Sequence, residues 1–144
     1  MLIKQISIFL ENKLGRLAKV TRILGENNID ICALSVADTT DFGILRLIVN
    51  QPDEAKQALV DSGFTVSIND VIAIEVEDKP GGLAKTLSIL DNKGIGIEYM
   101  YAFVGNSSAN NALVIFRVEQ PEKALEVLKN EDVHIKSPGE LYRI

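Results

Sequence analysis

Two short stretches of the chain carry residues suited to binding an anion. Residues 11–19 read ENKLGRLAK and residues 77–85 read EDKPGGLAK, each between an apolar run and a segment with helical spacing. The first backbone N–H groups of a helix lack helical partners and carry the positive end of its dipole, so a small carboxylate can bind there. A glycine in such a turn leaves the backbone uncovered. The alternative is a purely structural turn, in which Asn12 or Asp78 only caps the helix.

Other residues that could do chemistry have no plausible partners in the sequence. His134 is the only histidine and falls on a terminal strand-like segment, so we expect a surface or edge residue. Cys32 is the only cysteine, which excludes an internal disulfide, and we expect a small buried side chain. The carboxylates Glu75, Glu77 and Asp78 would suit a ferredoxin-like enzyme, but a solvated strand end is the simpler interpretation. We expect neither catalysis nor a metal or other cofactor.

Composition and charge limit the kinds of molecule that the protein could bind. The chain has 144 residues, 47% of them hydrophobic, and a formal net charge of -5. That charge argues against binding nucleic acid or an anionic membrane, because both need a basic surface. The first residues, MLIKQISIFLENK, alternate like a strand and do not resemble a signal peptide, and no apolar run is long enough to span a membrane. We therefore expect a soluble cytoplasmic protein.

The chain is a tandem repeat. A shift of 66 positions aligns residues 11–31 with 77–97 without a gap, and a shift of 69 aligns residues 44–59 with 113–128. The three extra residues fall in the polar segment 105–111, where a loop tolerates insertion. We predict two domains, residues 1–69 and 70–144, of the same fold.

Each half gives the order strand, helix, strand, strand, helix, strand. Helical spacing follows each glycine turn, and Pro52 and Pro121 suit the first turn of a second helix. The strand-like segments are residues 2–10, 29–37, 43–50 and 64–68 in the first half and 71–77, 95–104, 112–119 and 133–135 in the second. This order predicts an α+β, ferredoxin-like βαββαβ unit, with both helices on one face of a four-stranded antiparallel sheet.

The motifs resemble those of the ACT domain, a small amino-acid-sensing module attached to many enzymes of amino-acid metabolism. DKPGGLAK follows the first strand of the second half, and NKGIGIEYMYA leads into its second strand. The resemblance covers essentially the whole chain as two consecutive copies. The second copy keeps the Asp-x-Pro-Gly signature of the family as Asp78, Pro80 and Gly81, whereas the first copy has Asn12 and Leu14 at the acidic and proline positions.

The resemblance implies two effector sites. It implies that ACT units pair side by side through their second strands, and that an effector binds where the turn of one unit faces the second strand of its neighbour. One implied site combines Asn12, Leu14, Gly15, Arg16 and Leu17 with Gly96 and Glu98; the other combines Asp78, Pro80, Gly81, Gly82 and Leu83 with Asp30 and Cys32. Helix amides would receive the carboxylate, and Asp30 or Asp78 would hold the ammonium. We expect unequal affinities, because only the first site contains Arg16.

The sequence therefore predicts a non-catalytic regulatory protein that binds a free amino acid. Binding would be coupled to assembly or to a partner enzyme of amino-acid metabolism, which requires the ligand to prefer one arrangement over another. A structural or adaptor module without a ligand is the alternative. We expect a symmetric homodimer. The sequence leaves the identity of the amino acid open, although Leu14 and Met100 would suit a branched or aromatic side chain.

Overall fold

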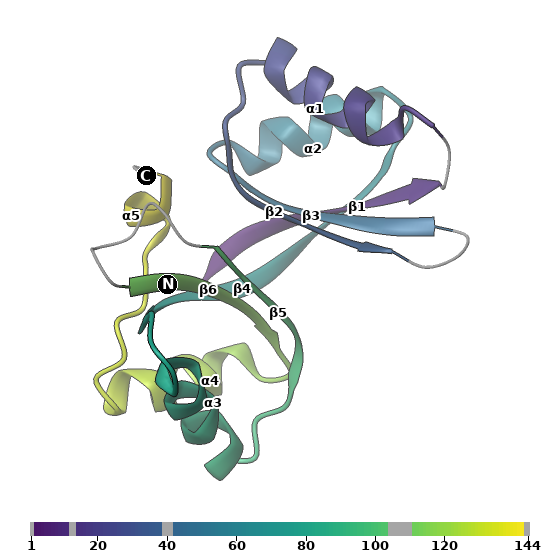
Figure 1. Ribbon diagram of the computed structural model, residues 1–144. Helices are drawn as coiled ribbons and strands as arrows, with labels where there is room; N and C mark the ends of the chain where they lie inside the picture. The colour runs from purple at the N-terminus through teal and green to yellow at the C-terminus, as the bar shows by residue number, and fades with distance from the viewer. Residues whose placement is uncertain (1, 12–13, 39–41, 104–110, 143–144) are drawn as a thin grey trace. The chain divides into compact units, whose positions relative to one another are not determined.

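The chain folds into two compact units. A computed structural model describes residues 2–11, 14–38, 42–103 and 111–142 (Figure 1). One unit is formed by Lys4–Asn69, and the other by Met1–Ile3 together with Asp70–Ile144. We call them the N-terminal unit and the C-terminal unit, and each is described by itself.

The N-terminal unit is a four-stranded antiparallel sheet with two helices. Along the chain it contains β1 (Ile3–Glu11), α1 (Arg16–Glu26), β2 (Ile31–Asp38), β3 (Phe42–Val49), α2 (Pro52–Asp61) and the first part of β4 (Thr65–Glu77). The strand order is β2-β3-β1-β4, and β3 pairs antiparallel with both of its neighbours. The Ser7 hydroxyl donates a hydrogen bond to Asn69 Oδ1 at 2.8 Å, which links β1 to β4. Both helices cover the same face of the sheet (Figure 1).

The C-terminal unit repeats this arrangement. It contains the second part of β4, α3 (Gly82–Asn92), β5 (Ile97–Phe103), β6 (Asn111–Val118), α4 (Pro121–Asn130) and the short helix α5 (Pro138–Tyr142). The strand order is β4-β6-β5. The segment 134–136 runs along the other edge of β4, where Glu75 N donates to His134 O at 3.0 Å and Lys136 N donates to Ala73 O at 2.8 Å. This segment takes the place of the fourth strand, so the predicted α+β fold of two ferredoxin-like units is confirmed.

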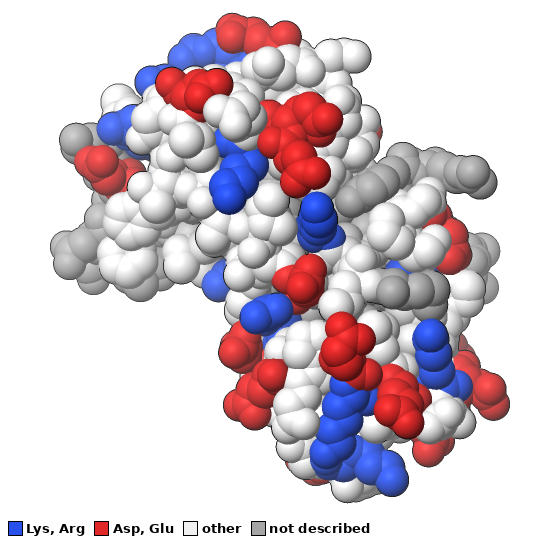
Figure 2. Space-filling model, turned by 180° about the vertical axis from the view of Figure 1, so that it is seen from behind, with Lys and Arg blue, Asp and Glu red and all other residues white. Residues whose placement is uncertain are grey.

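The surface mixes charges of both signs. On the face shown in Figure 2, the Lys and Arg side chains lie interspersed with Asp and Glu, and the described residues form no extended basic surface there. Within the described part of the chain, no helix has the length and apolar character needed to cross a membrane.

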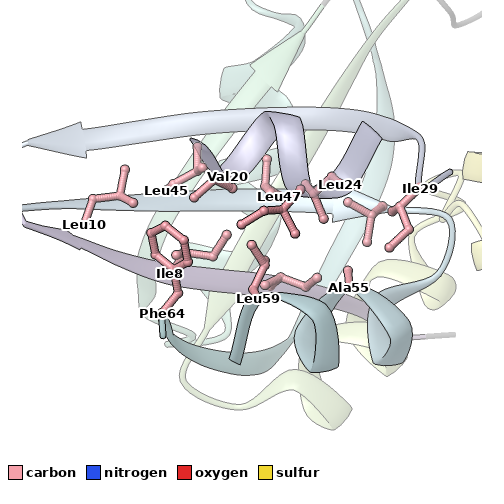
Figure 3. Packing of buried hydrophobic residues seen from close by; sticks show 13 residues of the cluster. Ile8, Leu10, Val20, Leu24, Ile29, Leu45, Leu47, Ala55, Leu59 and Phe64 are labelled. Atoms are coloured by element: carbon pink, nitrogen blue, oxygen red, sulfur yellow. The ribbon is translucent and has the colours of Figure 1, made fainter. Parts of the chain in front are cut away.

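The spacing of apolar residues explains how the helices pack. In the N-terminal unit, Val20 and Leu24 of α1 lie four residues apart, as do Ala55 and Leu59 of α2, so each pair projects from one helix face. Figure 3 shows these side chains packed against residues of β1 and β3, among them Leu47. The C-terminal unit has a separate core of the same kind, centred on Ile72, Ile74, Leu90, Val114, Phe116 and Leu128.

Candidate functional site

In each unit, one glycine with left-handed backbone conformation precedes the first helix. Gly15 precedes α1 with φ of +86°, and Gly81 precedes α3 with φ of +87°. Glycine is the residue that adopts this conformation without strain. Among the described residues, neither helix has an acidic side chain in its first turn or a side-chain hydrogen bond at its cap. In contrast, α2 and α4 carry acids there. No described side chain therefore caps the positive ends of α1 and α3, which suits the binding of an external anion.

Backbone hydrogen bonds hold the glycine turn that precedes α3. Lys79 N donates to Glu77 O at 2.9 Å, and Gly82 N donates to Lys79 O at 3.0 Å. This geometry brings the Glu77 carbonyl oxygen so close to the Cα of Gly82 that an added Cβ would overlap it. A Cβ on Gly81 would instead meet nothing within 4 Å. Gly81 is therefore needed for its backbone conformation and Gly82 for lack of space.

A hollow of about 410 Å³ opens beside this second turn. It lies within the C-terminal unit, between the end of β4, the start of α3 and the residues that follow α4. Its lining residues are Glu75, Val76, Glu77, Lys79, Pro80, Gly81, Gly82, Lys85, Thr86, Ile89, Asn111, Glu131, Asp132, Val133 and His134. Three predicted site residues, Pro80, Gly81 and Gly82, therefore line it. Asp78 is exposed and does not line the hollow, and Leu83 packs against the core of the unit.

Buried polar groups lie in the wall of the hollow. Thr86 is 7% exposed and lines the hollow. Glu75 Oε1 lies 2.9 Å from Lys136 Nζ, in a pair whose side chains are only 11% and 14% exposed. Asn111 Nδ2 donates to Glu75 Oε2 at 3.4 Å. The hydroxyl of Thr86, the carboxylate of Glu75 and the amide of Asn111 give this wall groups that can form hydrogen bonds to a ligand.

The charges around the hollow come from different elements. The turn and α3 provide Lys79 and Lys85, in addition to the helix N-terminus, whereas the segment after α4 provides Glu131 and Asp132. Lys79 Nζ lies 2.7 Å from Glu77 Oε2, and this hydrogen bond, followed by the charge of Lys79, lowers the pKa of Glu77. Groups of both signs suit a ligand that carries both an anionic and a cationic end. The described residues contain no cluster of three or more side chains that could hold a metal ion.

The glycine turn before α1 has much less free volume beside it than the glycine turn before α3. The Arg16 guanidinium lies 5.6 Å from the centre of the Phe64 ring, and its Nη2 lies 3.8 Å from Glu11 Oε1. Only about 40 Å³ remains beside it. Leu14 and Leu17 are exposed to solvent. Asn12, which was predicted to belong to this site, lies outside the described residues.

The predicted second-strand residues have partners within their own units. Asp30 N donates to Asn50 Oδ1 at 3.0 Å, and Glu98 pairs with Arg117 at 3.2 Å. Gly96 lies against the Glu119 side chain, so that a Cβ would come within 2.8 Å of its carboxylate. Cys32 is half-buried, and burial, followed by the charge of Asp30, raises the pKa of its thiol. The association of these residues with the turn of the other unit stays a prediction.

Several lining residues were not predicted as a site from the sequence. Thr86 and Asn111 had no predicted role. Glu75 was expected at a solvated strand end, which is wrong for this residue, because its side chain is only 11% exposed and pairs with Lys136. The repeat contained a usable signal: the shift of 66 places Thr86 opposite Val20, and the shift of 69 places Asn111 opposite Phe42. Polar residues that replace apolar ones at equivalent positions of a repeat mark a difference in what the two copies enclose.

Comparisons with known proteins agree with this fold. The family model described as an ACT domain pair matches residues 1–143. The crystal structure of a protein from Bacteroides thetaiotaomicron has a TM-score of 0.94 and 47% identity, and the match covers 100% of this chain and 98% of that one. The ligand-free regulatory subunit of aspartate kinase from Thermus thermophilus has a TM-score of 0.64 and 21% identity, with 88% and 91% covered. The same subunit from Thermus flavus gives 0.62 and 18%, with 88% and 90% covered. No curated protein sequence matches the chain.

Proposed function

Because this chain belongs to the ACT domain family, as a pair of ACT domains, we propose that it is a non-catalytic regulatory protein that binds a free amino acid. The observation that carries the proposal is the hollow beside Gly81, which combines a helix N-terminus without a side-chain cap, side chains of both charges and the Thr86 side chain. Its volume of about 410 Å³ lies within the range typical of small-molecule sites. The fold shared with regulatory subunits of aspartate kinase supports a regulatory role.

The groups of the hollow suggest how an amino acid would bind. Its carboxylate would accept hydrogen bonds from the first-turn amides of α3, with Lys85 nearby. Its ammonium group would face Glu131 and Asp132. Its side chain would contact the apolar surface provided by Val133 and its neighbours.

A regulatory protein of this kind acts on another molecule. We propose that binding changes a surface offered to a second copy of the chain or to an enzyme of amino-acid metabolism. The second-strand residues Asp30, Cys32, Gly96 and Glu98 are proposed as the residues from which a neighbouring unit would contribute to ligand binding at a turn. A ligand produces such a change only if it binds one arrangement more tightly than the other.

Thermal denaturation against each of the twenty L-amino acids tests the proposal. We expect one amino acid, or a few related ones, to raise the Tm in a concentration-dependent manner. A flat panel would contradict the proposal and favour an adaptor module without a ligand.

A matched pair of variants locates the site. Thr86→Val removes a hydroxyl from the wall of the hollow with little change in volume, and we expect about tenfold weaker binding by calorimetry. Thr21→Val is the control, because Thr21 is an exposed threonine of α1 whose hydroxyl bonds only to carbonyls of its own helix. Equal affinity in both variants would place the ligand elsewhere.

A further inference from the structure

We infer that each chain has one ligand site rather than two, because the N-terminal unit has closed its own copy of the hollow with Arg16 and Phe64. The inference rests on the proposed function, since it concerns where that ligand can bind. It follows from comparing the two turns position by position, which the internal repeat makes possible.

Two positions near the glycine turn hold large side chains in the N-terminal unit and small ones in the C-terminal unit. The shift of 66 places Gly82 opposite Arg16, and the shift of 69 places Val133 opposite Phe64. In the N-terminal unit these two large side chains contact each other, with the guanidinium 5.6 Å from the ring centre. In the C-terminal unit both small residues line the open hollow. The volume is about 40 Å³ where these two positions hold large side chains and about 410 Å³ where they hold small ones.

The wall positions also differ in polarity. Opposite Glu75 and Asn111 the first half has Phe9 and Phe42, by the same two shifts. The Phe9 and Phe42 rings stack on each other with their centres 5.0 Å apart. The N-terminal unit therefore places an aromatic pair where the C-terminal unit has a carboxylate and an amide that bond to each other.

Two cations at the start of α1, Arg16 and Lys19, contact other residues of their own unit. Arg16 reaches both Phe64 and Glu11, and Lys19 Nζ lies 5.7 Å from the centre of the same ring. The space that remains, about 40 Å³, is enough for about one water molecule and too small for an amino acid. The start of α1 therefore has only this small volume beside it, whereas the start of α3 lies beside the larger hollow.

Amide NMR spectra of the full chain, recorded during titration with each of the twenty L-amino acids, test the inference. We expect resonances of residues 81–86 to shift and those of residues 14–19 to stay in place, with one ligand bound per chain. Shifts at both turns, or at the first turn alone, would overturn the inference while leaving the proposed function intact. No shift anywhere would overturn both.

A variant that closes the second hollow gives an independent test. Val133→Phe copies the residue that fills the first turn, and we expect it to weaken binding at least tenfold. Val60→Phe, at an exposed position of α2 in the other unit, is the control and should bind like the parent. Unchanged resonances of residues 4–69 would show that Val133→Phe still folds. Undiminished binding in Val133→Phe would overturn the inference.

Discussion

Three glycine-to-alanine variants should differ in sign as well as in size. Gly25 lies in α1 with open space around its Cα, Gly81 has a left-handed backbone, and Gly82 lies against the Glu77 carbonyl. The same methyl group is added in each case, so the three sites separate helix propensity, backbone strain and steric overlap. The series tests whether the second turn has the tight geometry described above.

The expected magnitudes follow from these three environments. Gly25→Ala should stabilise the protein by about 0.5 kcal/mol, because alanine loses less entropy than glycine in a helix. At Gly81, the left-handed conformation costs alanine about 1–2 kcal/mol, partly offset by a gain through the unfolded state, for a net loss of about 1 kcal/mol. At Gly82, relief of the overlap must displace the carbonyl that Lys79 N bonds to at 2.9 Å. A lost hydrogen bond of about 1 kcal/mol and overpacking of about 1–3 kcal/mol give a loss of about 3 kcal/mol.

Urea denaturation followed by far-UV circular dichroism measures all three, since the chain has no tryptophan to report by fluorescence. We expect the order of stability Gly25→Ala, parent, Gly81→Ala, Gly82→Ala. If Gly82→Ala proved no less stable than Gly81→Ala, the overlap with Glu77 would not exist in solution. The explanation for glycine at this position would then be wrong.

Further predictions concern three other sites. Lys136→Met leaves the Glu75 carboxylate largely buried without its partner at 2.9 Å, so we expect a loss of about 2–3 kcal/mol in urea denaturation, most of it restored by adding Glu75→Gln. Burial, followed by a nearby carboxylate, raises the pKa of the Cys32 thiol, so its alkylation near neutral pH should be slower than in the urea-unfolded chain; equal rates would contradict this. A hydrogen bond from the Ser137 backbone, followed by side-chain hydrogen bonds, lowers the pKa of Glu140 below its ordinary value of 4.5. A lowered pKa adds stability above that value that is lost as the pH falls through the folded pKa, so Glu140→Gln should reduce the Tm at neutral pH and have less effect in acid.

The order of elements could be predicted because it depends on local patterns that occur twice. Alternating apolar residues indicated the strands, and spacing such as Val20 to Leu24 indicated the helices. Pro52 and Pro121 begin α2 and α4, as expected of proline in a first helical turn. The helix α5 was missed, although Ser137 and Glu140 form a reciprocal capping pair at its start, with Ser137 N donating to Glu140 Oε1 and Glu140 N donating to Ser137 Oγ.

The hollow could not be predicted because its walls come from segments distant in the sequence. Glu75, Thr86, Asn111 and Val133 meet only when β4, α3, β6 and the segment after α4 have packed together. The glycine turn was visible in the sequence, but an uncovered turn and a turn beside an enclosed volume look alike there. The size of side chains at positions such as Val133 decides whether an enclosed volume lies beside the turn. That size has an effect only through contacts that the fold creates.

The two turns show how a duplicated fold can divide stability and binding between its copies. In the N-terminal unit, stacked aromatic rings and a guanidinium over Phe64 stabilise this region by ring stacking and cation–π attraction. In the C-terminal unit, Glu75 and Asn111 stand at the positions of the two stacked rings, and Glu75 forms a largely buried ion pair with Lys136, which is a poor source of stability. Residues that lower stability without a structural gain are characteristic of functional sites. A ligand in this hollow should therefore stabilise the C-terminal unit more than the N-terminal unit, because its contacts would form with residues of that unit.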